Sequence, residues 1–323
     1  MTKPAFITIL AALALMAGAV GTWTDVQQLH RIAPGYARGL TMHHHYSALN
    51  GTAGIPWAQR PLCEWIVEGL YRVIKPPDIG GREGSGLTLL ICILRVFTEA
   101  GVILAAAWYL RVWRIGRAMT VLLCCTIGWA YLTCCRDAAL YLNLHAELIM
   151  CLIAAGMLVR GKTTIPLILI PFMAANRETS IVIPVMMLAL GWRHLGAIAL
   201  WLAVWVGVNA HTLGCLRLTD SIGPLNYPVA NIMREATWIN HAATWMVMPA
   251  LALVFWRKWP PLLKRWFWMV APAWMIVNLI FCRVNETRVF LLPYILFVLP
   301  VVGQGVEEAA PYWRVEGWEG WEK

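Results

Sequence analysis

Apolar runs follow one another along almost the whole chain, and short turns between them carry most of the charge. A helix needs about 20 apolar residues to cross a bilayer. The pattern therefore predicts ten membrane-spanning helices, with both termini on the cytoplasmic side. Their approximate ranges are 5–22, 87–110, 118–135, 138–159, 163–176, 179–192, 195–213, 242–256, 266–282 and 289–303.

The predicted pair 163–176 and 179–192 is short for a bilayer crossing. Two arrangements fit this length. Either the two helices are tilted or extended through the turn between them, or they form a broken hairpin. In both cases the turn is drawn toward membrane depth, where irregular backbone is stable only if it lines a cavity.

The turns between the apolar runs are of two kinds. The basic turns hold Arg111, Arg114 and Arg117; Arg160 and Lys162; Arg193 and His194; and Arg257, Lys258, Lys264 and Arg265. The mixed turns are Arg136-Asp137, Asn176-Arg177-Glu178 and Asn285-Glu286-Thr287-Arg288. Short loops rich in Lys and Arg stay in the cytoplasm, so the mixed turns are expected on the opposite side. Charges clustered on one face of a membrane protein indicate an active site.

Composition supports this interpretation. The 323 residues are 60% hydrophobic and only 13% charged, with a mean hydropathy of +0.63. A soluble domain of this length carries about 25% charged residues. We therefore predict an all-α, polytopic transmembrane helical bundle. The net charge of +9 does not indicate nucleic acid, because much of the excess lies in short turns that set topology and meet anionic lipid.

The domain organisation follows from the same pattern. Residues 1–303 are predicted to form one transmembrane domain, with extracytoplasmic loops at 23–86 and 214–241, and residues 304–323 form a polar, Trp-rich cytoplasmic tail. Apolar segments of the first loop are too short to span, and we expect them to form interfacial helices. The first 20 residues resemble a signal peptide, with cleavage near Ala19 as the alternative to an uncleaved first helix. We prefer the uncleaved helix because the later helices then alternate consistently in the direction in which they cross the membrane.

Metal binding has little support in the sequence. The nine cysteines fit no zinc spacing and are mostly inside apolar runs. Cys63 and Cys215 both fall in predicted outer loops, where two free thiols are favoured over a disulfide. Three adjacent histidines, His43 to His45, cannot all face one ion in a regular element, so a solvated loop is favoured over a metal site. We predict no metal and no cofactor, and nothing in the sequence supports a divalent ion.

Charged residues inside the apolar runs need partners. Arg95 and Glu99 are four residues apart and share a helix face, so we expect a packing pair that faces the bundle interior. His145 and Glu147 are two residues apart and lie on different faces, which argues against joint ligation of one metal.

The candidate catalytic residues are Asp25, Asp137 and Glu286, and the candidate substrate-binding residues are Arg60, Arg136, Asn176, Arg177, Glu178 and Arg288. Asp25 alone would be interpreted as a helix-end carboxylate in water, just beyond the first helix. The other candidate residues change this interpretation of Asp25, because all of them are predicted on the same side of the membrane, within reach of one cavity.

These motifs resemble those of a group of bacterial integral membrane proteins that are similar to the GT-C glycosyltransferase superfamily. The resemblance rests on Asp25, Arg60-Pro61-Leu62, Asn176-Arg177-Glu178-Thr179 followed by Pro184, and Glu286-Thr287-Arg288-Val289-Phe290 followed by Pro293. It runs over most of the chain in order. One departure matters: the paired acidic residues common after the first helix of GT-C enzymes are reduced here to Asp25.

The resemblance implies a membrane enzyme of the bacterial cytoplasmic membrane that takes a sugar from a polyprenyl-phosphate-type donor and transfers it on the outer face. Such a reaction needs a carboxylate base, for which Asp25 is the first candidate. It also needs cations for the departing phosphate, and Arg60, Arg136, Arg177 and Arg288 suit that role. Glu178 and Glu286 are candidates to orient these arginines or bind sugar hydroxyls. Each adjacent acid–base pair taken singly is better explained as a structural ion pair, but the set as a whole is not.

Two other classes remain open. A transporter or flippase of lipid-linked or polar solutes also places charges in broken helices near the midplane. Such proteins usually show two matching halves, and this sequence shows none. A non-catalytic membrane subunit with the same fold is the third class. The expected partners are the lipid-linked sugar donor and membrane lipids, and no nucleic acid.

Overall fold

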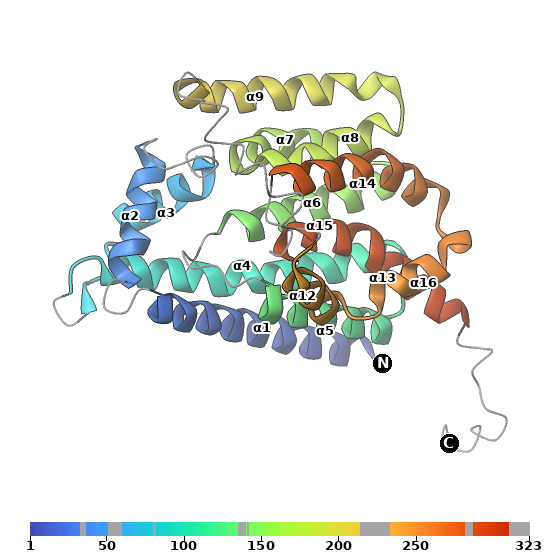
Figure 1. Cartoon of the computed structure of the whole chain (residues 1–323), viewed down its shortest axis with the longest axis horizontal. Coiled ribbons are helices and arrows are strands. Elements are labelled where there is room, and N and C mark those ends of the chain that lie inside the picture. The colour runs from blue at the N-terminus through green and yellow to red at the C-terminus, as the bar shows by residue number, and fades with distance from the viewer. Residues whose placement is uncertain are drawn as a thin grey trace, which may run out of the picture.

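The computed structural model describes residues 1–32, 37–50, 60–79, 82–134, 140, 142–213, 233–281 and 287–309, and these residues are helical or irregular, without a strand (Figure 1). The helices are α1 (Lys3–Ile32), α2 (Ala37–Leu49), α3 (Pro61–Ile74), α4 (Ser85–Val112), α5 (Arg117–Cys134), α6 (Asn143–Val159), α7 (Thr164–Asn176), α8 (Val182–Leu188), α9 (Leu195–Leu213), α12 (Glu235–Trp245), α13 (Met248–Val254), α14 (Pro261–Phe281), α15 (Leu291–Pro293) and α16 (Leu299–Ala309).

Four helical segments of the described chain are long and apolar enough to cross a membrane: Lys3–Arg31, Ser85–Val112, Trp192–Ala210 and Thr287–Ala309. Shorter apolar helices accompany them at Arg117–Thr133, Asn143–Val159, Thr164–Asn176 and Glu178–Leu188. The all-α fold predicted from the sequence is confirmed, and the helices are consistent with an integral membrane protein.

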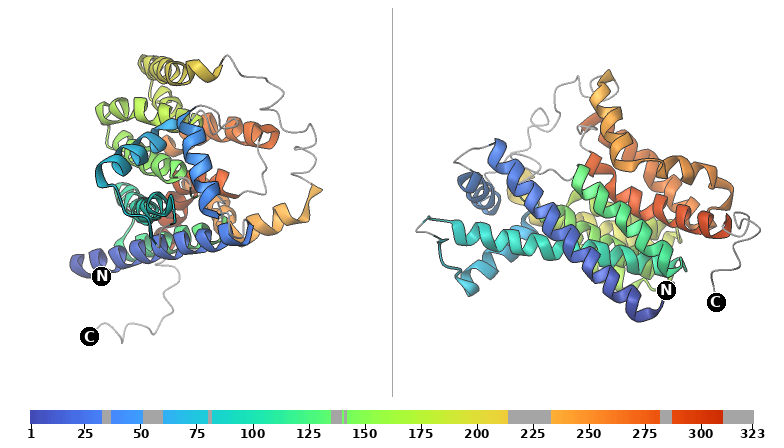
Figure 2. Two further views of the ribbon diagram at one scale, coloured as in Figure 1. Left: turned by 90° about the vertical axis from the view of Figure 1, so that its left-hand side faces the viewer. Right: turned by 90° about the horizontal axis from the view of Figure 1, so that it is seen from below.

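Helices α1 and α4 pack along each other, and α6 covers the other side of α4 (Figure 2). Small residues allow the close approach of α1 and α4. A Cβ atom at Gly18 would collide with the backbone carbonyl of Val96, and one at Gly21 would collide with the Glu99 carboxylate. Because lipid tails are as apolar as the helices, such close packing replaces the hydrophobic effect as the source of stability.

The first helix is longer than predicted. It was expected to end at residue 22, but α1 runs to Ile32 and contains Asp25 in its last third. The prediction was wrong because it stopped at the end of the apolar run. The polar residues beyond it remain helical, and Val26 and Leu29 pack into a second apolar cluster with Leu87 and Ile91.

The short pair of helices forms the broken hairpin. Helix α7 ends at Asn176, Arg177 is extended with φ −157° and ψ 142°, and a 3₁₀ turn, η3 (Glu178–Ile181), leads into α8. Of the two arrangements open at the sequence level, the structure has the hairpin. The break presents Arg177 and Glu178 between two helices instead of on a helix surface.

Three other predicted ranges are corrected. The span expected at 242–256 is two short helices, α12 and α13, separated at Met246 with φ 49°. Part of the predicted outer loop 214–241 is the start of α12, while residues 214–232 lie outside the described part. The predicted tail begins inside α16, which continues a π turn, η7 (Tyr294–Val298), to Ala309, and residues 310–323 lie outside the described part.

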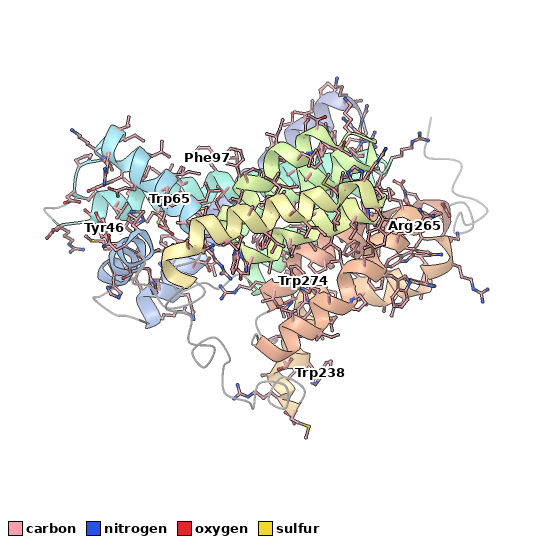
Figure 3. All side chains as sticks on the ribbon, turned by 90° about the horizontal axis from the view of Figure 1, so that it is seen from above. Tyr46, Trp65, Phe97, Trp238, Arg265 and Trp274 are labelled. Atoms are coloured by element: carbon pink, nitrogen blue, oxygen red, sulfur yellow. The ribbon has the colours of Figure 1, made fainter. Side chains whose placement is uncertain are left out.

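The two ends of the bundle differ in chemistry. At one end the N-terminus, the α4–α5 turn and α16 are joined: Arg117 Nη1 donates to the Met1 carbonyl (3.1 Å), and Gly116 N donates to Glu307 Oε1 (2.7 Å). Lys258 Nζ pairs with Glu308 Oε2 at 3.2 Å. Helices α2 and α3 lie at the opposite end (Figure 1). Figure 3 shows the same separation, with Arg265 far from Tyr46 and Trp65.

Candidate functional site

An ion pair joins the start of α3 to the broken hairpin. Arg60 is the residue before α3, and its Nε donates to Glu178 Oε2 (2.9 Å) while its Nη2 donates to Glu178 Oε1. This is the two-pronged geometry of a strong Arg–carboxylate pair. Burial lowers the pKa of Arg60, but the charge and hydrogen bonds of Glu178 outweigh burial and raise it. The Glu178 side chain remains 33% exposed, so one side of this pair is open.

Arg177 binds a different carboxylate. Its Nη1 lies 3.0 Å from Glu147 Oε2, and the Thr179 hydroxyl donates to Glu147 Oε1. The alternative of an ion pair between Arg177 and Glu178 is wrong. The extended backbone at Arg177 directs neighbouring side chains to opposite sides, so the two residues bind separate partners.

Arg177 also holds an unused donor. Its Nε is buried and has no hydrogen-bond partner among the described residues. A buried donor without a partner costs about 1–3 kcal/mol. A ligand oxygen at this position would remove that cost.

A third guanidinium lies near the first two. Arg288 belongs to the 3₁₀ turn η6 (Thr287–Phe290), and its charge acts on both Arg60 and Arg177. The turn is held by hydrogen bonds from Trp274 Nε1 to the Val289 carbonyl (3.0 Å) and between the hydroxyls of Thr287 and Thr244 (3.2 Å). The cluster thus contains three arginines and two glutamates (Glu147 and Glu178). Guanidinium groups are suited to bind the oxygens of an anion.

Asn176 fixes the positions of these segments. It is fully buried, and its Nδ2 donates to the Asn143 carbonyl (2.8 Å). Asn143 Nδ2 in turn donates to the Arg60 carbonyl (3.1 Å), and the Cys63 thiol donates to Asn176 Oδ1 (3.1 Å). These contacts give Asn176 a positioning role, and its expected binding of substrate stays a prediction. Cys63 is a free thiol, as favoured at the sequence level, and Cys215 lies outside the described residues.

An apolar groove opens beside the arginine cluster. It lies between α8 and α14, has a volume of about 180 Å³, and has Glu178 and Thr179 in its wall. The apolar lining includes Ile181, Val182, Val185, Met269, Ala273 and Val277. Trp274, labelled in Figure 3, also lines it, and the same residue holds η6 in place. The charged cluster and the groove together fit an amphipathic ligand with an anionic head.

Asp25 belongs to a second, separate network. Its carboxylate accepts a hydrogen bond from Arg95 Nη2, while Arg95 Nε donates to Glu99 Oε1 (2.9 Å). His145 Nε2 lies 3.6 Å from Glu99 Oε1. Asp25 is 3% exposed and Arg95 and Glu99 are each 1% exposed. The interior pair of Arg95 and Glu99 is confirmed. Asp25 was expected within reach of one cavity with the other candidates, but it is buried against Arg95.

The structure thus brings Arg60, Arg177, Glu178 and Arg288 together and places Asp25 elsewhere. Arg136, Asp137 and Glu286 lie outside the described residues. Sequence reasoning missed Glu147 as the partner of Arg177. The signal was present, because a carboxylate within an apolar helix must have a partner or a function. His145 and Glu147 do face different networks, as their spacing predicted.

Comparisons with protein-family models, with curated proteins and with solved structures found no match to this chain. What the cluster can bind therefore follows from its own residues: three guanidinium groups, a buried donor and an adjoining apolar groove.

The histidine tract has a different role from the one considered for it. His45 lies in α2 with its side chain 1% exposed; its Nδ1 is 2.5 Å from Glu64 Oε2, and its Nε2 is 3.2 Å from Glu68 Oε2 on α3. The favoured solvated loop is wrong for His45, which fastens α2 to α3. In the described part of the chain, no group of three His, Cys, Asp or Glu side chains is arranged to hold a metal ion.

This contact predicts a pH-dependent stability. Burial lowers the pKa of His45, but Glu64 and Glu68 outweigh it, so the pKa is raised above 6.5. The contribution of protonated His45 is therefore complete below about pH 6.5 and is lost as the pH rises through the raised value. The melting temperature in detergent should fall over this range, and His45→Gln should reduce the fall. His43→Gln is the control, because His43 is exposed; equal pH profiles for wild type and His45→Gln would contradict the assignment.

Proposed function

We propose that this chain is a GT-C-like membrane glycosyltransferase, which moves a sugar from a polyprenyl-phosphate-type donor to an acceptor on the non-cytoplasmic face. The observation that carries the proposal is the buried Nε of Arg177, which has no hydrogen-bond partner among the described residues. Arg60 and Arg288 act on the same guanidinium, and the neighbouring Glu178 lies in the wall of an apolar groove. A lipid phosphate is the ligand whose two parts match these two surfaces. The likeness of the sequence motifs to GT-C enzymes and the expected bundle of ten helices belong to the same proposal.

In this proposal the arginines neutralise the departing phosphate. Arg177 donates from Nε to a phosphate oxygen while Glu147, which accepts a hydrogen bond from Thr179, holds its side chain. Arg60 and Arg288 supply further positive charge, and Glu178 orients Arg60. The first lipid units lie between α8 and α14.

The general base must be a carboxylate that can accept the proton of the acceptor hydroxyl. Asp25 is held by Arg95 and buried, so we place Glu286 before it in this role. Glu286 directly precedes Thr287 and Arg288 in the sequence, and Arg288 belongs to the arginine cluster. Asp137 is the remaining candidate.

Transfer of labelled sugar from a polyprenyl-phosphate donor in proteoliposomes tests the proposal. Ala273→Trp fills the groove and should raise the donor KM at least tenfold, because the lipid loses its place. Ala203→Trp on the exposed face of α9 is the matched control and should change nothing. Glu286→Gln should lower kcat about 10²–10⁴-fold, the usual effect of losing a general base. No transfer by the wild-type chain from any polyprenyl-phosphate sugar would remove the proposed function.

Orientation is a further part of the proposal. The chain is expected in the bacterial cytoplasmic membrane with both termini inside, because the N-terminus and α16 lie at the same end as the basic turns. In a chain whose nine native cysteines are replaced, Arg72→Cys on α3 should react with an impermeant thiol reagent added outside. Lys258→Cys should react only after the membrane is opened. The reverse pattern would put the arginine cluster near the cytoplasmic face.

One observation favours a transporter as the second candidate. Asp25, Arg95, Glu99 and His145 form a buried ionisable network between α1, α4 and α6. Such networks occur in proton relays of transporters. Proton-coupled solute uptake that is lost in Glu99→Gln, without sugar transfer by the wild type, would favour this class.

A further inference from the structure

A second hollow lies at the end of the bundle formed by α2 and α3. Its volume is about 490 Å³, within the range of small-molecule sites. Tyr46 and Asn50 line it from the end of α2, and Trp65, Glu68, Gly69 and Arg72 line it from α3. The α3 residues are spaced three and four apart, so one face of that helix forms the wall.

The lining combines aromatic rings with charge-balanced polar groups. Tyr46 is 39% exposed and Trp65 is 49% exposed, which leaves both rings available to a ligand. Glu68 Oε1 accepts a hydrogen bond from Arg72 Nε at 2.6 Å, so these two charges cancel. Flat aromatic faces pack on the C–H faces of sugar rings, while carboxylate, guanidinium and amide groups bind hydroxyls. A neutral, hydroxyl-rich ligand matches this lining better than an anion does.

In the wall of the hollow, the Glu68 side chain is held in place by His45, and the position of Gly69 is open. His45 binds Glu68 Oε2 at 3.2 Å and Glu64 Oε2 at 2.5 Å, which holds the Glu68 carboxylate in place before a ligand arrives. A Cβ atom at Gly69 would meet no described atom within 4 Å. The missing side chain at position 69 therefore leaves the space between the aromatic rings and the polar groups unfilled.

The neighbouring face of α3 is apolar and suits the membrane surface. Ile66 is 50% exposed and Val73 is 81% exposed, and they lie about 80–100° around the helix from Trp65. Trp65 is therefore placed between an apolar face and the polar wall. A membrane anchor alone would not need Asn50, Glu68 and Arg72 around the ring.

We propose that this hollow is a saccharide-binding subsite that holds a neutral glycan acceptor. The proposal rests on the proposed glycosyl transfer for the identity of the ligand as an acceptor, but not for the binding itself. Helix α3 connects the two sites directly: Arg60 precedes its first turn, and Trp65 to Arg72 follow five to twelve residues later, about 8–18 Å along the axis. An acceptor chain of a few sugar rings spans that distance.

Binding of maltotriose, cellotriose and chitotriose to the purified full chain in detergent, followed by saturation-transfer NMR and calorimetry, tests the subsite without any donor. We expect saturable binding of at least one of the three. Gly69→Leu places a side chain in the hollow, where its Cβ atom meets no described atom within 4 Å, and should weaken that binding at least tenfold. Gly207→Leu is the matched control, because a Cβ atom there also meets no described atom within 4 Å. Trp65→Ala should weaken binding to a similar extent, while Trp192→Ala, at an 81% exposed residue, should not.

The outcomes separate the subsite from the proposed function. Saturable binding that Gly69→Leu removes, in a chain that transfers no sugar, supports the subsite and overturns the transferase. Transfer without binding of any of the three trisaccharides, or binding unaffected by Gly69→Leu, overturns the subsite and leaves the transferase standing. If Trp65→Ala lowers the affinity of the chain for lipid vesicles but leaves trisaccharide binding unchanged, Trp65 is a membrane anchor and the subsite is wrong.

Discussion

Arg95→Met is expected to remove most of the folded protein from the membrane fraction. Arg95 is 1% exposed and is bound to two buried carboxylates, Asp25 and Glu99. Its loss breaks both of these ion pairs, and breaking a buried pair costs about 3–5 kcal/mol. This is a large part of the 5–15 kcal/mol that stabilises a typical protein. Size-exclusion profiles and thermal unfolding of a fluorescent fusion in detergent measure the effect.

Arg72→Met is the control for Arg95→Met. Arg72 also pairs with a glutamate four residues away, but its side chain is 76% exposed, so the change should cost less than about 1 kcal/mol. The triple variant Asp25→Asn/Arg95→Met/Glu99→Gln removes all three charges and should recover much of the folded protein. An Arg95→Met protein that accumulates and melts like wild type would show that the network does not stabilise the bundle.

The variant Asp25→Asn tests whether the carboxylate of Asp25 has a structural or a catalytic role. Arg95 keeps Glu99 in this variant, so the loss of stability should be much smaller than in Arg95→Met. Because Asp25 is buried against Arg95, we expect transfer to persist. A fall of about 10²–10⁴-fold in kcat with an unchanged melting temperature would return Asp25 to the role of general base.

Arg177→Lys is expected to lower transfer about 10²–10³-fold while the protein still folds. Lysine keeps a positive charge near Glu147, which is 1% exposed, but it lacks the Nε donor that we assign to phosphate. Removing one preorganised donor from a developing anion typically has this effect on kcat. Arg177→Met should also lower the yield of folded protein, since Glu147 then loses its ion-pair partner and keeps the hydrogen bond from Thr179.

The control for Arg177→Lys is Arg160→Lys at the basic end of the bundle. Arg160 lies over the Trp108 ring at 5.1 Å, is exposed, and should tolerate lysine. Transfer at the wild-type rate by Arg177→Lys would mean that the Nε of Arg177 does not bind the donor phosphate.

The sequence predicted the elements better than their contacts. Long apolar runs without charge have one stable arrangement in a membrane, the helix, because every backbone polar group must be satisfied within the segment. The range 195–213 is therefore found as predicted. Helix ends were harder to predict. Helix α1 continues past its apolar run to Ile32, because residues on other helices bind its polar side chains, as Arg95 does by donating a hydrogen bond to Asp25.

Half of the candidate site was predictable for the same reason. Charges cost so much in a membrane that Arg60, Arg177, Glu178 and Arg288 had to lie near partners or water. Their pairing was not predictable. Arg60 and Glu178 are 118 residues apart in the chain, and no local spacing indicates that contact.

The sequence alone was enough to predict a helical chain with long apolar helices of the kind found in integral membrane proteins, because this depends on the local cost of placing backbone polar groups in lipid. Which charges meet depends on the tertiary structure. Because α1 packs on α4, Asp25 pairs with Arg95. Because the backbone at Arg177 is extended, Arg177 pairs with Glu147 while Glu178 pairs with Arg60. The apolar groove between α8 and α14 is likewise a product of packing, since its two walls are about 90 residues apart in the sequence.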